Sequence, residues 1–572
     1  MPSFDRKDVI FACVLIFLGA LIHGVALSNP FYFDDVFVIR ENAWLHGVTP
    51  PKGWFGSLWV DSHHLFAGFR PLLMLSFYLN RFLFGESPAS FRLVNIALHI
   101  LNSLWVAILF RQLYSSKNGS RLSWIVGLFF LLHPIQTLGI NFLWKRSTLF
   151  ETTFVLTQLI LHVHARQQGR YRNSLAGGQI LLFTAALFVK ESALLIPSYL
   201  FLVDWLFFDW RVIWQRRDAR LLYLSFLSLG VAFYFFRFDF IPSKLAGERF
   251  VLPNWHSWDW WNYLMVSLGV IPRYVGLWLM PAPRLIDDPR PLIDFPWGDA
   301  IATSLLFILS ILTSIRFWTT TKWVAFASCL FWIYLLPQTS IFPLYFPMDQ
   351  ARLYFPLAGL CGLVAIILKG AARRAPRFLS PKWIFPMVIA TYGSHSFFQH
   401  RQYSVPAKIW QDVVLEYENS DLAWASLGQE LAASNLYRSA AIAFLMASRC
   451  EDRNSGYHIL AYHNMLREGV PLELIKQWLS QTMMRNLSLP DTVNLAVLLR
   501  ELEETEAARF VLVDLLKRFP NYAPAHLQLA AISEVLGDNV TALQEYERTL
   551  KLMPSDQEAK NGIVRLMKKK RQ

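Results

Sequence analysis

The stretch VIFACVLIFLGALIHGVAL, residues 9–27, decides the fold class of this chain. A helix needs about 20 consecutive apolar residues to cross a bilayer. The stretch is longer than the apolar core of a signal peptide and lacks a cleavage site of small residues, so we expect a retained membrane helix. Arg6 and Lys7 precede it, and a basic flank of this kind places the N-terminus in the cytoplasm.

The composition extends the membrane interpretation to most of the chain. Hydrophobic residues make up 54% and charged residues 17% of the 572 residues, whereas soluble domains are nearer a quarter charged. The net charge of +13 does not indicate nucleic acid, because the basic residues gather in short connections between apolar segments, as in cytoplasmic membrane loops. Four scattered cysteines predict neither disulfides nor a metal site, so no resident metal is assigned and a divalent cation stays open.

Further apolar segments predict a polytopic helical bundle with eleven crossings, at 9–27, 91–110, 122–142, 148–165, 176–190, 192–208, 219–237, 299–315, 323–342, 350–368 and 383–399. The connections on the inner side are basic only if the stretch 263–281, which contains Pro272 and Arg273, does not cross. This topology places the C-terminus outside the cytoplasm. It also leaves two long external loops, 28–90 and 238–298, where function is often located.

After residue 400 the sequence changes to a soluble helical pattern with a period of 34 residues. Repeats are expected at 421–454, 455–488, 489–522 and 523–556, with a capping helix after residue 556. Position seven of these repeats reads Leu427, Ala461, Leu495 and Leu529, and position twenty reads Ala440, Leu474, Ala508 and Ala542. The period and pattern are those of tetratricopeptide repeats. We therefore predict an all-α chain with a membrane domain at 1–400 and an α-solenoid at 401–572.

Ionisable residues at the predicted outer ends of the membrane helices are the candidates for a functional site, because charges near membrane depth are usually functional or paired. They are Asp34, Asp35, Arg70, His133, Lys145, Arg146, Lys190, Glu191, Arg273, Asp287, Asp288, Asp349 and Arg352. Such a set suits group transfer from an anionic lipid carrier. A carboxylate can act as general base on an acceptor hydroxyl, and Arg and Lys can bind the carrier phosphate as it leaves.

Each of these residues also has a structural alternative. Asp34 and Asp35 can form a turn or a helix cap, and Lys145 with Arg146 can extend toward water from a short loop. Lys190 and Glu191 can form a local ion pair, and His133 before Pro134 can be a hydrogen-bonded structural group. The residues alone leave these alternatives open.

Ordered motifs give the chain a family resemblance. FYFDDVFVIREN (31–42), LLHPIQTLGINFLWKRSTL (131–149), FVKESALLIPSYLFLVDW (188–205), IPRYVGLWLMPAPRLIDD (271–288) and FPMDQARLYFPLAGL (346–360) resemble the transmembrane and tetratricopeptide-repeat O-mannosyltransferases and their bacterial relatives. These belong to the GT-C class of polyprenyl-phosphate-dependent glycosyltransferases. The resemblance covers nearly the whole chain.

The resemblance implies roles for particular residues. It makes Asp34 the favoured catalytic base of the Asp34–Asp35 pair. It also implies that Lys190 and Glu191 correspond to the family's Lys-Glu motif, and that Arg352 and Tyr354 belong to its Arg-Leu-Tyr motif, both with a role in substrate binding. Where relatives carry Glu-Arg before Leu-Tyr, this chain has Asp349 set further back, which leaves the acidic partner of Arg352 open. The loop WKRS departs from the usual pattern at Arg146.

The leading hypothesis is an inverting glycosyltransferase that moves mannose or another hexose from a polyprenyl-phosphate carrier to a hydroxyl outside the cytoplasm. Its expected partners are membrane lipid, the lipid-linked sugar donor, and a protein acceptor bound by the repeats. A glycan ligase, a lipid-headgroup glycosyltransferase and a non-enzymatic scaffold remain alternatives. The compact chain favours a bacterial inner membrane with periplasmic repeats, and an endoplasmic reticulum membrane with luminal repeats is the alternative.

Overall fold

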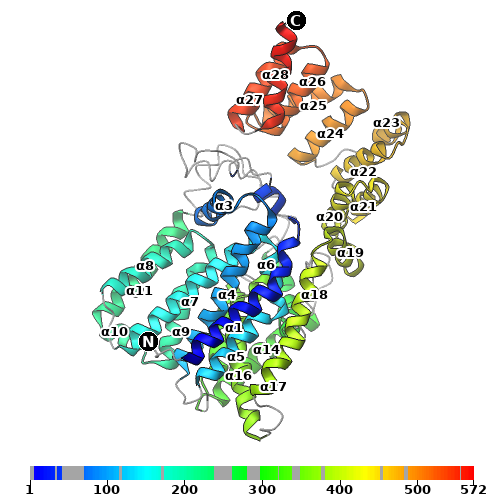
Figure 1. Ribbon diagram of the computed structural model, residues 1–572. Coiled ribbons are helices and arrows are strands. Elements are labelled where there is room, and N and C mark those ends of the chain that lie inside the picture. Colours follow the sequence, from blue (N-terminus) through cyan, green and yellow to red (C-terminus); the bar gives the residue numbers. More distant parts are fainter. Residues whose placement is uncertain are drawn as a thin grey trace. The chain divides into compact units, whose positions relative to one another are not determined.

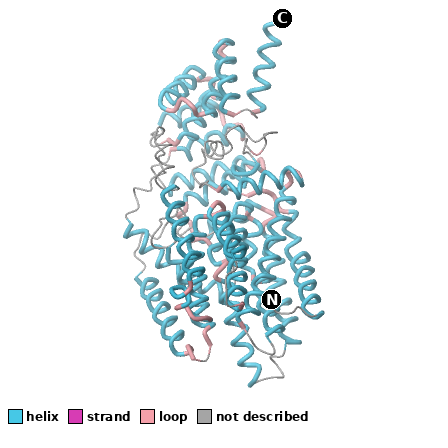
Figure 2. The backbone as a smooth tube through the Cα atoms, turned by 90° about the vertical axis from the view of Figure 1, so that its left-hand side faces the viewer, coloured by secondary structure: helices cyan, strands magenta, loops and turns pink. Residues whose placement is uncertain are grey.

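The computed structural model of the chain describes most of the sequence. The described residues are 6–32, 35–40, 45, 70–114, 119–168, 173–236, 260–279, 297–319, 321–337, 348–374, 381–450, 455–481, 487–553 and 556–571. Within them every regular element is a helix (Figures 1 and 2), which confirms the all-α prediction for this part of the chain. They divide into two compact units: the described residues up to Arg40 and from Arg70 to Val405 form the first, and Leu45 with the described residues from Pro406 onward form the second.

The first unit contains the apolar helices. Its elements are α1 (Arg6–His23), η1 (Gly24–Ser28), η2 (Val36–Arg40), α3 (Pro71–Phe84), α4 (Pro88–Leu113), α5 (Gly119–Leu132), η3 (Pro134–Gln136), α6 (Thr137–Asn141), η4 (Leu143–Lys145), α7 (Arg146–Gln167), α8 (Asn173–Leu187), η5 (Glu191–Leu195), α9 (Ile196–Phe207), α10 (Val212–Gln215), α11 (Arg217–Phe235), α13 (Trp260–Leu279), α14 (Trp297–Arg316), α15 (Trp323–Leu336), η9 (Gln350–Leu353), α16 (Leu357–Arg374), α17 (Pro381–Val388), η10 (Ile389–Gly393) and α18 (Ser394–Gln402). Each predicted crossing segment coincides with one or more of these helices.

Four of these helices are long and apolar enough to span a membrane, within the described residues: α1 with η1, α4, α11 and α14. Apolar side chains point outward from them, as Leu305, Ile308 and Leu312 do on α14. A helix that exposes large aliphatic residues is unfavourable in water and expected in lipid. The helix α13, which was predicted not to cross, is absent from this set. The count of eleven crossings remains a prediction.

The predicted span 122–142 is not one straight helix, because the chain bends by 51° between α5 and η3. Pro134 has no N–H group, so the helix cannot continue through it. The carbonyls freed at the break are satisfied by side chains from other helices. The Leu131 oxygen accepts from His23 and His99, each at 2.9 Å, and the Leu132 oxygen accepts from Ser396 at 2.8 Å. Backbone groups at membrane depth need such replacement partners.

Helix α4 carries a buried polar face through the centre of the first unit. Arg92, Asn95, His99 and Asn102 recur at helical spacing, and none of them is exposed. Asn102 donates to the Leu149 oxygen of α7 at 3.0 Å. This polar face ties α4 to the segments around the helix break and to the beginning of α7.

The second unit is a series of helix pairs. Its helices are α19 (Pro406–Glu416), α20 (Asp421–Ala433), α21 (Tyr437–Cys450), α22 (Gly456–Arg467), α23 (Leu472–Gln481), α24 (Leu489–Glu501), α25 (Thr505–Arg518), α26 (Ala523–Val535), α27 (Asn539–Leu552) and α28 (Gln557–Arg571). The first helices of the pairs begin at the predicted repeat starts, except that α22 begins one residue late. The tetratricopeptide assignment remains a prediction.

The second repeat is shifted by one residue relative to the predicted pattern. Ala440, Ala508 and Ala542 are fully buried at position twenty, as expected. Leu474, at the equivalent position, is 37% exposed, and the next residue, Ile475, is fully buried in its place. The shift is confined to α23, because Ala461 on α22 is fully buried at the predicted position seven.

Candidate active site

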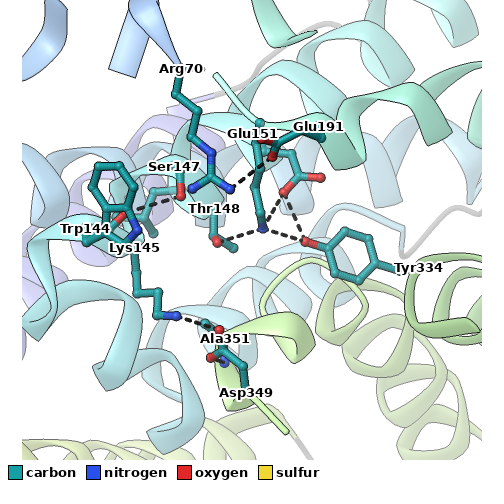
Figure 3. Close-up of polar contacts among 12 residues, drawn as sticks. Arg70, Trp144, Lys145, Ser147, Thr148, Glu151, Glu191, Tyr334, Asp349 and Ala351 are labelled. Atoms are coloured by element: carbon teal, nitrogen blue, oxygen red, sulfur yellow. Dashed lines mark hydrogen bonds and ion pairs between the residues drawn. The ribbon is translucent and has the colours of Figure 1, made fainter. Parts of the chain in front are cut away.

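Three ion pairs lie near the beginnings of α7, η5 and η9, and Figure 3 shows them in one view. Arg70, directly before α3, places Nη2 3.0 Å from Oε2 of Glu191. Its guanidinium lies 5.5 Å from the centre of the Trp144 ring. The other two pairs are Lys190–Glu151 and Lys145–Asp349. Residues distant in sequence therefore supply cations and carboxylates to one region.

Lys190 occupies the extended connection between α8 and η5. Its Nζ donates to Oγ1 of Thr148 at 3.0 Å and to the hydroxyl of Tyr334 at 3.2 Å. The same nitrogen lies 3.0 Å from Oε2 of Glu151, and the lysine side chain is 15% exposed. The ammonium is thus held by three side chains, and the lysine side chain remains partly exposed.

Lys145 and Asp349 form a second anchored pair, with Nζ 2.5 Å from Oδ2. The other carboxylate oxygen accepts from the N–H group of Ala351 and caps η9. Burial disfavours the ionised form of Asp349, but Lys145 and Arg352 outweigh burial and hold the pKa of this carboxyl at about 2. A carboxylate with so low a pKa is a weak proton acceptor near neutral pH. Asp349 therefore suits the positioning of cations better than base catalysis.

Asp35 is a buried capping residue. Its two oxygens accept from the backbone N–H groups of Leu143, at 3.1 Å, and Trp144, at 2.9 Å. The carboxylate is fully buried, and Arg92 and Arg146 interact with it electrostatically. Asp35 thus fixes the η4 turn that presents Lys145.

The first acid of the pair, Asp34, lies outside the described residues, as do Asp287 and Asp288. Its assignment as the catalytic base remains a prediction. For Asp35 the structure agrees with the alternative of a capping residue, because both of its oxygens accept backbone hydrogen bonds.

Arg146 is fully buried, and its guanidinium donates to other parts of the fold. Nε donates to Oδ1 of Asn95, and Nη2 donates to Oδ1 of Asn80 and to the oxygen of Phe91, each at 2.8 Å. The guanidinium also lies 4.5 Å from the centre of the Phe77 ring. This placement favours a role in holding α3, α4 and α7 together over the phosphate contact predicted from the sequence.

His133 and Tyr354 are also engaged inside the fold, and each is 2% exposed. Nδ1 of His133 accepts from the N–H group of Ile135 and caps η3. The hydroxyl of Tyr354 lies 2.7 Å from Nδ1 of His99 and accepts from Asn102 at 3.3 Å. These contacts give both residues structural partners inside the fold.

Arg352 and Arg273 complete the predicted set. Arg352 is 5% exposed in η9 and interacts electrostatically with Asp349, which provides the acidic neighbour that the sequence left open. Arg273 is half-buried in α13 and makes no hydrogen bond or ion pair in the described part of the chain. The next residue, Tyr274, brackets Asp349 by accepting from its N–H group and donating to its carbonyl.

Three residues of the region were not singled out from the sequence: Thr148, Glu151 and Tyr334. Thr148 and Glu151 are three residues apart on α7 and so share one helix face. A carboxylate inside an apolar segment is a signal that could have identified Glu151. Tyr334 carries no comparable signal, because aromatic residues are frequent throughout α15.

One described cavity, of about 450 Å³, lies between η1 and α18. Its lining residues are Gly24, Val25, Leu27, Ser28, Asn29, Phe397, Arg401 and Ser404. None of the predicted site residues is among them, so the cavity is not assigned to the site. Within the described residues, no group of three His, Cys, Asp or Glu side chains is arranged to bind a metal ion.

The sequence of the chain was compared with those of known proteins. No family model matches the chain. Protein O-mannosyl-transferase F38B6.6 of Caenorhabditis elegans is 26% identical over 372 residues, which cover 62% of this chain and 51% of the relative. Protein O-mannosyl-transferase TMTC3 of Homo sapiens is 22% identical over 497 residues, covering 80% of this chain and 53% of the relative.

The chain resembles the protein O-mannosyl-transferases. A shorter match to protein O-mannosyl-transferase tmtc2 of Xenopus laevis is 32% identical over 162 residues, covering 27% of this chain and 18% of the relative. The resemblance inferred from the motifs is therefore confirmed. The chain spans about half the length of the curated relatives that match most of it.

Proposed function

We propose that this chain is a membrane glycosyltransferase that moves a hexose, with mannose favoured, from a polyprenyl-phosphate carrier to a Ser or Thr hydroxyl of a protein. The observation that carries the proposal is the partly exposed Lys190, whose ammonium Thr148, Glu151 and Tyr334 hold beside the Arg70–Glu191 pair. Cations fixed in this way suit an anionic leaving group. The names of the relatives favour mannose and a protein acceptor.

The reaction is a single displacement that inverts the anomeric carbon. Asp34 takes the proton of the acceptor hydroxyl, whose oxygen bonds to C1 of the sugar. The bond between C1 and the phosphate oxygen breaks, and polyprenyl phosphate leaves with the bonding electron pair. Lys190, Arg70 and Arg352 stabilise the negative charge that develops on the phosphate, and Arg273 is a further cation for the carrier.

The surroundings of Lys145 and Asp35 support these roles. Helix α7 begins next to Lys145, and the N-terminus of a helix favours bound anions. Asp35 holds the η4 turn in place through two backbone hydrogen bonds. In this proposal the reaction takes place on the non-cytoplasmic side of a bacterial inner membrane, and the helix pairs after residue 406 bind the acceptor protein.

The test is transfer of radiolabelled mannose from a polyprenyl-phosphate donor to a Ser/Thr peptide by the purified full chain. We expect Asp34→Asn to lower transfer at least about 100-fold, because general-base catalysis typically contributes that much, while thermal unfolding stays unchanged. Asp218→Asn, at the partly exposed Arg216–Asp218 pair, is the matched control and should keep full activity.

The product decides between the alternatives. Mass spectrometry should find one hexose on a Ser or Thr side chain. A long glycan on the peptide, or a sugar on a lipid headgroup, would contradict the proposal, as would full activity of Asp34→Asn.

A further inference from the structure

A buried carboxylate pairs with the partly exposed lysine of the site. Glu151 is in the second turn of α7 and is 1% exposed, whereas the Lys190 side chain is 15% exposed. Part of the Lys190 side chain is therefore open to a ligand, whereas the carboxylate of Glu151 is not. Any influence of Glu151 on a ligand must act through the residues that it contacts.

Those contacts form a closed arrangement around Lys190. One carboxylate oxygen, Oε2, lies 3.0 Å from Nζ of Lys190 and accepts from the Tyr334 hydroxyl, also at 3.0 Å. Nζ of Lys190 also donates to the Tyr334 hydroxyl at 3.2 Å and to Oγ1 of Thr148 at 3.0 Å. Glu151, Tyr334 and Thr148 thus fix the direction in which the ammonium points (Figure 3).

The surroundings of the second carboxylate oxygen of Glu151 indicate that the charge of this residue has a function. Oε1 is buried and has no hydrogen-bond partner in the described structure. A buried carboxylate oxygen without a partner is unfavourable, and native structures contain few such groups without a reason. The charge matters most for the neighbouring ammonium.

We propose that Glu151 is a positioning residue that orients the Lys190 ammonium toward the phosphate of the lipid carrier, with Tyr334 and Thr148 as its partners. This inference rests on the proposed function, because it takes the carrier phosphate as the ligand of Lys190. It adds a residue that contacts neither substrate and controls the affinity for the donor.

The experiment measures binding of undecaprenyl monophosphate to the purified full chain in detergent, with undecaprenol as the probe that lacks phosphate. The variants are Glu151→Gln, Lys190→Met and the double variant. Glu86→Gln, which changes an exposed glutamate paired with Arg81, is the control for a Glu-to-Gln change outside the site. A double-mutant cycle separates a contribution made through Lys190 from an independent one.

We expect Glu151→Gln to weaken phosphate-dependent binding about 10-fold or more, and Glu151→Asp to recover part of the loss. In the Lys190→Met background the same substitution should change binding less than about twofold, because the residue through which Glu151 acts is gone. Undecaprenol should bind equally to all variants, and Glu86→Gln should match the unmodified chain.

Two results would overturn the inference: an unchanged affinity in Glu151→Gln, or an equal loss in both backgrounds. If Glu151→Gln does not fold, Tyr334→Phe decides, because it removes only the hydroxyl shared by Lys190 and Glu151. That variant should bind the phosphate several-fold more weakly, and unchanged binding would refute the inference. If the unmodified chain binds both lipids equally, the proposed function fails and the inference with it.

Discussion

Neighbouring charged residues have different surroundings in this chain. Lys145 pairs with Asp349 and keeps 25% of its side chain exposed, whereas Arg146 is fully buried and donates to Asn95 and Asn80. The change from η4 to α7 lies between these two residues, so their side chains leave the backbone in different directions. A dipeptide that reads as one basic patch in the sequence is therefore one accessible cation and one internal support.

Asp35 allows a test of this division between supporting and reacting groups. We expect Asp35→Asn to lower the free energy of unfolding by about 1–3 kcal/mol, because one amide oxygen replaces two ionised acceptors of backbone hydrogen bonds. The rate of mannose transfer by Asp35→Asn should fall together with its free energy of unfolding. Asp34→Asn, in contrast, should lose transfer alone.

Thermal unfolding of both variants in detergent, beside the transfer assay, makes the comparison. A stable but inactive Asp35→Asn would reverse the two roles and identify Asp35 as the base. Asp218→Asn again provides the reference for an Asp-to-Asn change at a partly exposed position.

At the scale of elements, the break between α5 and η3 organises the middle of the first unit. Because the Leu131 oxygen can only accept, Nε2 of His23 donates to it, and in the neutral ring Nδ1 then accepts from Nε2 of His400. Nδ1 of His400 then accepts from Asn141, whose Oδ1 accepts from Asn29. All these bonds run in one donor direction, which requires neutral imidazoles. They link α1 to α18 through the broken helix.

His400 is the residue to substitute in this chain of hydrogen bonds. His400→Phe should lower the free energy of unfolding by about 1–3 kcal/mol, since it leaves His23 and Asn141 with buried polar atoms that lack a partner. His395→Phe, on the same helix and only partly buried, is the matched control. Equal melting temperatures for both variants in detergent would contradict the interpretation.

In the second unit, the close approach of α20 and α21 depends on a glycine. A Cβ atom added at Gly428 would lie 3.0 Å from the ring of Phe444. Gly428→Leu should therefore force the pair apart and cost about 1–3 kcal/mol of stability. Hydrogen exchange of the full chain should become faster across 421–450, whereas Ala433→Leu, at an exposed position of α20, should leave exchange unchanged. Unchanged protection in Gly428→Leu would show that the pair does not need this contact.

For the whole molecule, the central prediction is the side of the membrane on which the second unit lies. Cys450 is the natural probe, after Cys13, Cys329 and Cys361 are replaced by alanine. In sealed inverted vesicles an impermeant maleimide should label Cys450 only after the membrane is opened. Burial, together with the charge of Asp421, raises the pKa of this thiol. Labelling should therefore speed up as the pH rises through the alkaline range, because the thiolate reacts.

Labelling of closed inverted vesicles would place the repeats in the cytoplasm and separate them from an external site. The same vesicles test whether the number of crossings is odd. Eleven crossings, with the N-terminus in the cytoplasm as the basic flank predicts, place the two ends of the chain on opposite sides.

The sequence by itself determined the helical class, the position of each apolar segment and the spacing of the helix pairs. These are local properties, because hydropathy and helical period are set by residues close in the chain. It also identified Arg70, Lys190 and Glu191, which the fold brings together. Only the tertiary structure assigned the partners: Asp35 to the η4 turn, Asp349 to Lys145 and Glu151 to Lys190. Those pairs join residues on different segments, and the packing of the helices decides which side chains meet.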